Sequence, residues 1–101
     1  MRYKQPKDTE TLHWTKHALE KMRFYGLSEA RVKRVLESPE RREEGIAENT
    51  VACMQPTGST KHPTEIWVMV TEKKGKRRLV SAWRYPGRTK PRDPVPIPDD
   101  F

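Results

Sequence analysis

Two segments near the start of the chain carry apolar residues at helical spacing. In the first, over residues 15–25, an apolar residue recurs every three or four positions: Ala18, Leu19, Met22 and Tyr25. Thr15 is a suitable N-cap, because its hydroxyl can accept a hydrogen bond from a free backbone N–H. Gly26 follows at the position where glycine adopts the left-handed conformation without strain. The pattern therefore predicts a helix over residues 15–25.

The second segment follows directly and is also amphipathic. Ser28 is a suitable N-cap, and Leu27 and Val32 flank it at the spacing of a hydrophobic staple. The apolar stripe of this segment consists of Val32, Val35 and Leu36. The segment ends at Ser38-Pro39, because the residue before a proline avoids helical geometry. Together the two segments predict a helical hairpin.

From residue 40 onward, the apolar pattern is typical of strands. We expect strands over residues 40–46, 50–55, 65–72 and 77–85. The third is the clearest, because its side chains alternate between two faces: Ile66, Val68 and Val70 on one, and Trp67, Met69 and Thr71 on the other. A loop over residues 56–63 and a tight turn over residues 73–76 join these strands. Since the last two strands are apolar on both faces, one face should pack on the helices and the other should be partly covered.

These elements predict an α+β fold in which two N-terminal helices pack on a curved antiparallel sheet of three to four strands. The folded domain would cover residues 12–88, after a loose arm at residues 1–11. Residues 89–101 include four prolines and predict an extended, polyproline-like tail. Such a tail can wrap the domain, bind a partner or stay disordered, and its composition favours disorder.

Length and composition limit the class of protein. At 101 residues and 33% apolar residues, the chain should form one domain with a small core, much of it supplied by three tryptophans. No apolar run approaches the roughly 20 residues of a membrane span, and residues 1–10 lack the apolar centre of a signal peptide. The single cysteine, Cys53, excludes an internal disulfide framework and a four-cysteine zinc site. We therefore expect a cytoplasmic protein that does not associate with membranes.

Positive charge is concentrated in the middle and later part of the chain. The formal net charge is +7, but residues 49–92 hold 10 basic and 2 acidic side chains, whereas the last nine residues carry −3. A local excess of this kind favours a polyanion such as nucleic acid as the partner. The alternative is that lysine and arginine only keep a small domain in solution.

His17 is the first candidate for chemistry. In the first turn of a helix the dipole disfavours the charged imidazole, which leaves His17 available as a general base. The alternative is a structural role, in which the His17 side chain lies over the sheet edge and caps the end of a strand through hydrogen bonds. A metal site with His13 is not expected, because a third ligand would have to come from an unrelated segment and the Thr15 cap places His13 outside the helix. We expect no cofactor, and we expect Cys53 to be a buried strand residue, since no neighbouring base activates it.

The strongest support for a nucleic-acid partner is a set of basic residues near the last predicted strand: Lys73, Lys74, Lys76, Arg77, Arg78, Arg84, Arg88, Lys90 and Arg92. Arg84 differs from the others because it ends an apolar strand, between Trp83 and Tyr85. Packing there would hold its guanidinium ready to grip a phosphate with two hydrogen bonds. Tyr85 could stack on a base or donate a proton. Trp67 and Trp83 are either stacking platforms or core residues, with core favoured.

Three stretches of the helical half carry a family resemblance: His17-Ala18-Leu19-Glu20-Lys21-Met22, Tyr25-Gly26-Leu27-Ser28 and Leu36-Glu37-Ser38-Pro39. They resemble a prokaryotic domain of unknown function that is grouped with the RelE/ParE/HigB-like toxin superfamily. The resemblance covers roughly residues 12–86, and its strand half matches by pattern only. It implies the RelE-like fold of two helices on a curved antiparallel sheet, in agreement with the expectation above.

The resemblance also implies an activity, the metal-independent cleavage of RNA by its own 2′-hydroxyl. It implies that His17 acts as base or acid, that Arg84 stabilises the phosphate, and that Tyr85 orients or protonates. It also implies that Lys16 and Arg23 bind the RNA backbone. The local positive charge adds further predicted RNA-binding residues: Lys73, Lys74, Lys76, Arg77, Arg78 and Arg88. Implied partners are RNA, the ribosome and an acidic antitoxin. A nucleic-acid-binding module without catalysis, or a protein-interaction domain that uses its tail or sheet edge, remains an alternative.

Overall fold

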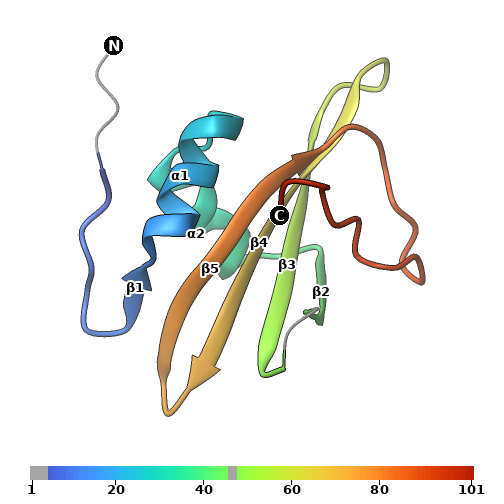
Figure 1. Ribbon diagram of the computed structural model, residues 1–101. Coiled ribbons are helices and arrows are strands. Elements are labelled where there is room, and N and C mark those ends of the chain that lie inside the picture. Colours follow the sequence, from blue (N-terminus) through green and yellow to red (C-terminus); the bar gives the residue numbers. More distant parts are fainter. Residues whose placement is uncertain (1–4, 46–47) are drawn as a thin grey trace.

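The computed structural model describes residues 5–45 and 48–101. Within these residues the chain forms two helices and one five-stranded sheet (Figure 1): β1 (Leu12–Trp14), α1 (Lys16–Tyr25), α2 (Glu29–Glu37), β2 (Arg41–Glu44), β3 (Thr50–Gly58), β4 (Pro63–Lys73) and β5 (Lys76–Tyr85). The strand order is β1-β5-β4-β3-β2. β1 is parallel to β5, and all other neighbouring strands are antiparallel.

This topology corrects the predicted fold class. We expected two N-terminal helices on an antiparallel sheet of three to four strands, but a strand precedes the helices and the described sheet has five strands of mixed direction. β1 has only three residues, too few to show the alternation typical of a strand, and its partner β5 lies far away in the sequence. The Asp8 carboxylate accepts a hydrogen bond from the backbone N–H of Trp14 at 2.8 Å. Part of the expected loose arm is therefore fastened to β1.

Both helices begin and end where the sequence predicts. The hydroxyl of Thr15 accepts from the backbone N–H of Ala18 at 3.1 Å, and the hydroxyl of Ser28 accepts from the backbone N–H of Arg31 at 3.1 Å. These bonds satisfy N–H groups that have no partner within the helix. Gly26 ends α1 in the left-handed conformation, with φ of 67°. The predicted helical hairpin is confirmed.

The strands follow the predicted order but differ in length. β2 begins at Arg41, and the end of the predicted 40–46 strand falls on residue 46, outside the described residues. β3 continues through Pro56 to Gly58, so the predicted loop over residues 56–63 shortens to residues 59–62. Proline is tolerated there because β2 pairs with β3 only as far as Met54, which leaves the Pro56 nitrogen without a strand partner on that side.

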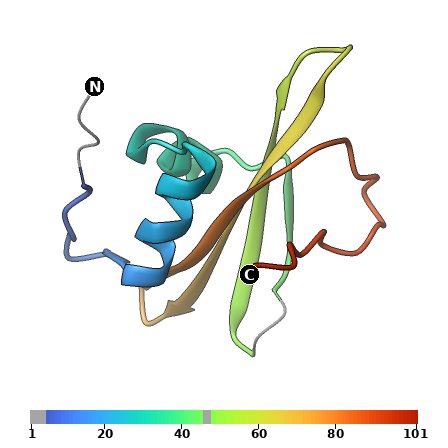
Figure 2. The same ribbon diagram turned by 45° about the horizontal axis from the view of Figure 1, so that its top comes forward.

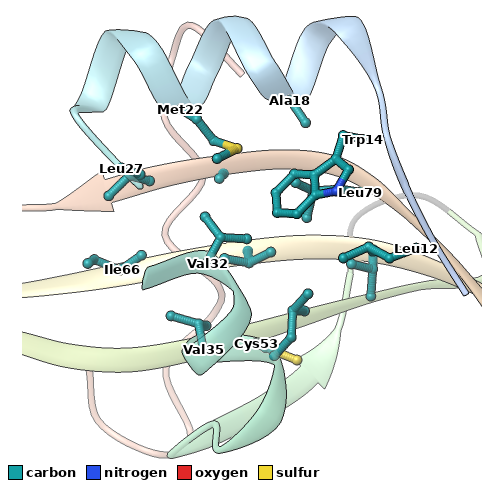
Figure 3. Packing of buried hydrophobic residues seen from close by; sticks show 14 residues of the cluster. Leu12, Trp14, Ala18, Met22, Leu27, Val32, Val35, Cys53, Ile66 and Leu79 are labelled. Atoms are coloured by element: carbon teal, nitrogen blue, oxygen red, sulfur yellow. The ribbon is translucent and has the colours of Figure 1, made fainter. Parts of the chain in front are cut away.

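The sheet buries apolar side chains on both faces, as the alternation in β4 predicts. Under the helices lies the larger cluster (Figure 3), which includes Ala18, Met22, Val32, Val35, Ile66, Val68 and Leu79. The opposite face carries a smaller buried cluster of Ala52, Met54, Trp67, Met69 and Trp83. The rings of Trp67 and Trp83 stack with centroids 6.2 Å apart. The prediction that these two tryptophans are core residues is confirmed.

The C-terminal tail covers this smaller cluster. In Figure 2 the tail and the helices lie on opposite sides of the sheet. Val95 and Phe101 pack against the cluster, and the indole N–H of Trp83 donates to the Pro96 carbonyl at 2.9 Å. Residues 86–101 form no helix or strand, so the tail is irregular as expected. It is not disordered, however, because the apolar face of the sheet gives its apolar residues a surface to pack on. The tail wraps the domain.

A buried polar network fastens the base of the tail. Glu65, only 1% exposed, accepts hydrogen bonds from the Trp67 indole at 3.0 Å and from the backbone N–H and hydroxyl of Thr89 at 2.9 Å. Arg41, 7% exposed, donates to the Thr89 hydroxyl and, at 2.8 Å, to the Asp93 carbonyl. The guanidinium of Arg41 also lies 5.0 Å from the centre of the Trp67 ring. The two buried charges are thus connected through Thr89.

Gly58, at the end of β3, gives a sharp test of the β3–β4 connection. Its φ is +82°, and a Cβ atom there would lie 2.3 Å from the backbone oxygen of His62. Gly58→Ala is expected to destabilise the protein by about 3 kcal/mol, because a strained φ and a backbone clash act together. The control is Gly75→Ala, where φ is +78° and nothing lies within 4 Å; about 1–2 kcal/mol is expected there. Urea unfolding compares the two, and equal losses would contradict the clash.

Candidate anion-binding site

Helix α1 runs along an unpaired edge of β5. β1 pairs with β5 only as far as Leu79, so among the described residues no strand lies on that side of residues 80–85. Near the start of α1, the Thr15 hydroxyl donates to the Leu79 carbonyl at 2.7 Å. Near its end, Arg84 Nη2 donates to the Tyr25 carbonyl at 3.4 Å. Side chains of α1 can therefore reach past the edge of β5 to the tail.

Three side chains on one side of α1 contact the last two residues of the tail. His17, Lys21 and Tyr25 are four residues apart and so share one side of the helix. Lys21 Nζ pairs with the Asp100 carboxylate at 3.1 Å and also donates to the Asp100 carbonyl. The Tyr25 hydroxyl donates to the other carboxylate oxygen of Asp100 at 2.9 Å. His17 Nε2 lies 2.6 Å from the main-chain oxygen of Phe101.

Arg84 extends this group at the end of β5. It is half-buried, and it lies beside a cavity of about 350 Å³ that also reaches Tyr25, Tyr85 and Asp99. Strand alternation predicts opposite faces for Arg84 and Tyr85. Tyr85 does pack against the tryptophan cluster, yet both line the same cavity, because it opens at the strand end between α1 and the tail. We name His17, Lys21, Tyr25 and Arg84 the α1 site.

The α1 site favours negative charge. The pKa of the Asp100 carboxyl is lowered, first by the hydrogen bond from Tyr25 and then by the hydrogen bond from Lys21. The pKa of the Tyr25 phenol is raised, first by burial and then by the hydrogen bond to Asp100. Tyr25 is therefore a protonated donor at neutral pH. Lys21 and Tyr25 hold the Asp100 carboxylate, and the His17 imidazole contacts the main-chain oxygen of the next residue. Such a set of donors also suits a phosphate.

The raised pKa of Tyr25 can be measured. A group with a raised pKa stabilises the folded state below its ordinary pKa and loses that contribution as the pH rises through the raised value. We expect Tyr25 to ionise above the ordinary pKa of a tyrosine side chain in an NMR titration of the ring-labelled protein. Asp100→Asn should lower the pKa of Tyr25 only in part, because burial is the largest cause. An unchanged pKa of Tyr25 in Asp100→Asn would contradict the contact.

The other predicted nucleic-acid-binding residues lie mostly at the far end of β5. We name as the hairpin patch the basic residues on and beside the β4–β5 turn: Lys73, Lys74, Lys76, Arg77 and Arg78. Shallow hollows of about 520 and 530 Å³ lie beside this turn. Arg84 lies seven positions after Arg77 along β5, a span of about 23 Å. The hairpin patch and the α1 site are thus two separate surfaces.

Three predicted residues lie outside both surfaces. Lys16 and Arg23 are exposed on α1. Arg88 is exposed after β5 and donates to the Thr64 carbonyl, so it holds the chain near the β3–β4 loop.

Sequence reasoning missed two members of the α1 site. Lys21 is not among the predicted site residues, and Tyr25 is predicted only as one of the apolar positions of the helix. Their four-residue spacing from His17 was the signal that could have identified them. The predicted structural role for His17, as a cap on a strand end, is wrong, because His17 contacts the tail instead.

The remaining candidates take structural positions. His13 Nδ1 lies 2.5 Å from the Asp8 carboxylate, outside α1 as predicted. Cys53 is buried in β3, and burial raises the pKa of its thiol, so it is a core residue as predicted. Within residues 5–45 and 48–101, no three His, Cys, Asp or Glu side chains form a group suited to a metal ion. Neither α1 nor α2, the helices of the described chain, is long and apolar enough to cross a membrane.

Comparison with models of protein families, with curated proteins and with solved structures found no match for this chain.

Proposed function

We propose that this protein binds RNA and cleaves it at the α1 site without a metal ion. The observation that carries the proposal is the set of donors around Asp100. Lys21 and Tyr25 already hold a carboxylate at 3.1 and 2.9 Å, beside an exposed histidine. A phosphodiester offers the same negatively charged oxygens to the same donors. The family resemblance of the helical half implies the same chemistry and remains a prediction, as does a cytoplasmic location.

Each residue of the α1 site has a role in this proposal. His17 Nε2 takes the proton of the ribose 2′-hydroxyl, and the oxygen attacks the adjacent phosphorus. Lys21 and Arg84 stabilise the charge that develops on the phosphate oxygens. The Tyr25 phenol gives its proton to the departing 5′-oxygen. Tyr25 therefore replaces Tyr85 as the proton donor, and Tyr85 is left to stack on a base. The product is a 2′,3′-cyclic phosphate.

The hairpin patch supplies affinity in this proposal. Five basic side chains near one turn attract the RNA backbone and release its counterions, which makes binding depend strongly on salt. An acidic antitoxin or a ribosomal site would bind through the same positive charge, and both remain predictions.

The contribution of the hairpin patch can be tested by its salt dependence. The variant Lys73→Ala/Lys74→Ala is expected to bind RNA more weakly and to lower the slope of log K against log salt by about 1–2. Fluorescence anisotropy between about 50 and 200 mM salt measures this slope. The control is Lys61→Ala/Lys90→Ala, which removes the same charge from exposed positions elsewhere. Equal slopes for the two variants would show that net charge matters and the patch does not.

The proposed activity is tested by incubating the purified protein with a mixed RNA pool in EDTA, beside DNA of the same sequences. The proposal predicts RNA fragments that end in 2′,3′-cyclic phosphate and intact DNA, because DNA lacks the attacking hydroxyl. Intact RNA with salt-dependent binding would support the second candidate, a binding module without catalysis, which the hairpin patch favours. The absence of RNA binding at low salt would overturn both.

A further inference from the structure

The last three residues of the chain, Asp99, Asp100 and Phe101, occupy the α1 site. We name them the tip. Asp100 engages Lys21 and Tyr25, and Phe101 contacts His17 through its main-chain oxygen. Asp99 lines the cavity beside Arg84. Every member of the α1 site is thus next to the tip of the same chain.

The tip combines the two features by which a nucleotide would be recognised. Its carboxylates supply negative charge to the donors of the α1 site. The ring of Phe101 lies edge-on to Trp83, with centroids 5.5 Å apart, and edge-on to His17, at 6.4 Å. The Phe101 ring therefore occupies the place, beside two other rings, where a base of the RNA would stack. The charge of the tip is opposite to that of residues 49–92.

The tail is held firmly at its base and weakly at its tip. At the base, Glu65 and Arg41 are 1% and 7% exposed and bind Thr89 in the buried network. At the tip, the Asp100 side chain is 44% exposed and its partner Lys21 is 15% exposed, so water reaches the carboxylate and weakens this ion pair. The tip can therefore leave the α1 site while the base of the tail stays in place.

We propose that the tip is an intramolecular competitor of RNA, which blocks the α1 site until RNA displaces it. The inference rests on the proposed function, since it assigns a regulator to the same site. The observed affinity for RNA is the intrinsic affinity multiplied by the fraction of molecules whose site is open. A tip that is docked in about 90% of molecules lowers the affinity about tenfold.

The test compares the full-length double variant Asp99→Asn/Asp100→Asn with the wild type. The control is Glu10→Gln/Glu37→Gln, which makes the same change in net charge at two exposed positions. Binding of a fluorescent RNA with 2′-O-methyl groups, which cannot be cleaved, is measured at equal salt. We expect the tip variant to bind about tenfold more tightly than the control variant. NMR of the Trp83 indole, recorded without RNA, reports whether each variant keeps its fold and the base of its tail.

The outcomes separate the two proposals. If the wild type binds RNA and the tip variant gains no more affinity than the control variant, the competitor role is overturned while RNA binding stands. If no folded variant binds RNA, the proposed function is overturned and the competitor role with it. If the tip variant binds more tightly, a peptide of residues 94–101 added to it should restore weak binding.

Discussion

Replacing His17 with alanine is expected to lower the rate of RNA cleavage by about 10²–10⁴-fold, the usual contribution of a positioned general base. Affinity for RNA should stay the same or rise slightly, because His17 holds the tip through Phe101 and the phosphate contacts come from other residues. The rate is measured on a single-turnover time course in EDTA, and the affinity on RNA that cannot be cleaved. A loss in rate without a loss in affinity separates the base from a binding residue.

The matched control is His62→Ala, which removes an exposed histidine from the loop between β3 and β4. It should cleave at the wild-type rate. If His17→Ala also cleaves at that rate, His17 is not the base, and the chemistry would have to depend on Lys21, Tyr25 or Arg84. If both histidine variants lose activity equally, the loss reflects charge or stability and not catalysis.

Glu65→Ala is expected to destabilise the protein by about 3–5 kcal/mol, because it breaks a buried polar network from one side. The carboxylate of Glu65 satisfies the Trp67 indole and two groups of Thr89. Without it the Trp67 indole stays buried without a partner and Thr89 loses its acceptor, although Arg41 keeps its ion pair with Glu43 at 3.5 Å. The free energy of unfolding is measured by urea titration. The same change should release the base of the tail, so the Phe101 ring should lose its contact with Trp83 in NMR spectra.

Glu72→Ala on the same strand is the control. Glu72 pairs with Arg42 at 3.0 Å on the surface, where both side chains are well exposed, and such pairs contribute about 0–1 kcal/mol. A loss for Glu65→Ala that is no larger than the loss for Glu72→Ala would show that the network does not hold the tail.

The helices of this fold could be predicted closely because their signals are local. The caps at Thr15 and Ser28 and the left-handed Gly26 each act within a few residues. The alternation in β4 likewise predicted a sheet that is covered on both faces. β1 could not be predicted in this way, because three residues are too few to show an alternation of apolar and polar side chains. The strand forms only by pairing with β5.

The candidate site could be predicted only in part, because its residues are also brought together by contacts between distant parts of the sequence. His17 could be predicted because it lies in the first turn of a helix, and Arg84 because it lies at the end of an apolar strand. Their connection depends on the tail, which places Asp100 next to Lys21 and Tyr25 from the other end of the chain. Disorder was favoured for the tail because its composition is rich in proline. Its order comes from Trp83 and from the network of Arg41, Glu65 and Thr89, which are long-range contacts.

The most direct test of the α1 site is an NMR titration of the labelled wild-type protein with a short 2′-O-methyl RNA. Binding at the α1 site predicts progressive shifts at His17, Lys21 and Tyr25, with the signals of Asp100 and Phe101 moving toward those of a free tail. The hairpin patch should shift at the same RNA concentrations. Shifts confined to the hairpin patch, with the tip unmoved at saturation, would contradict an RNA site on α1.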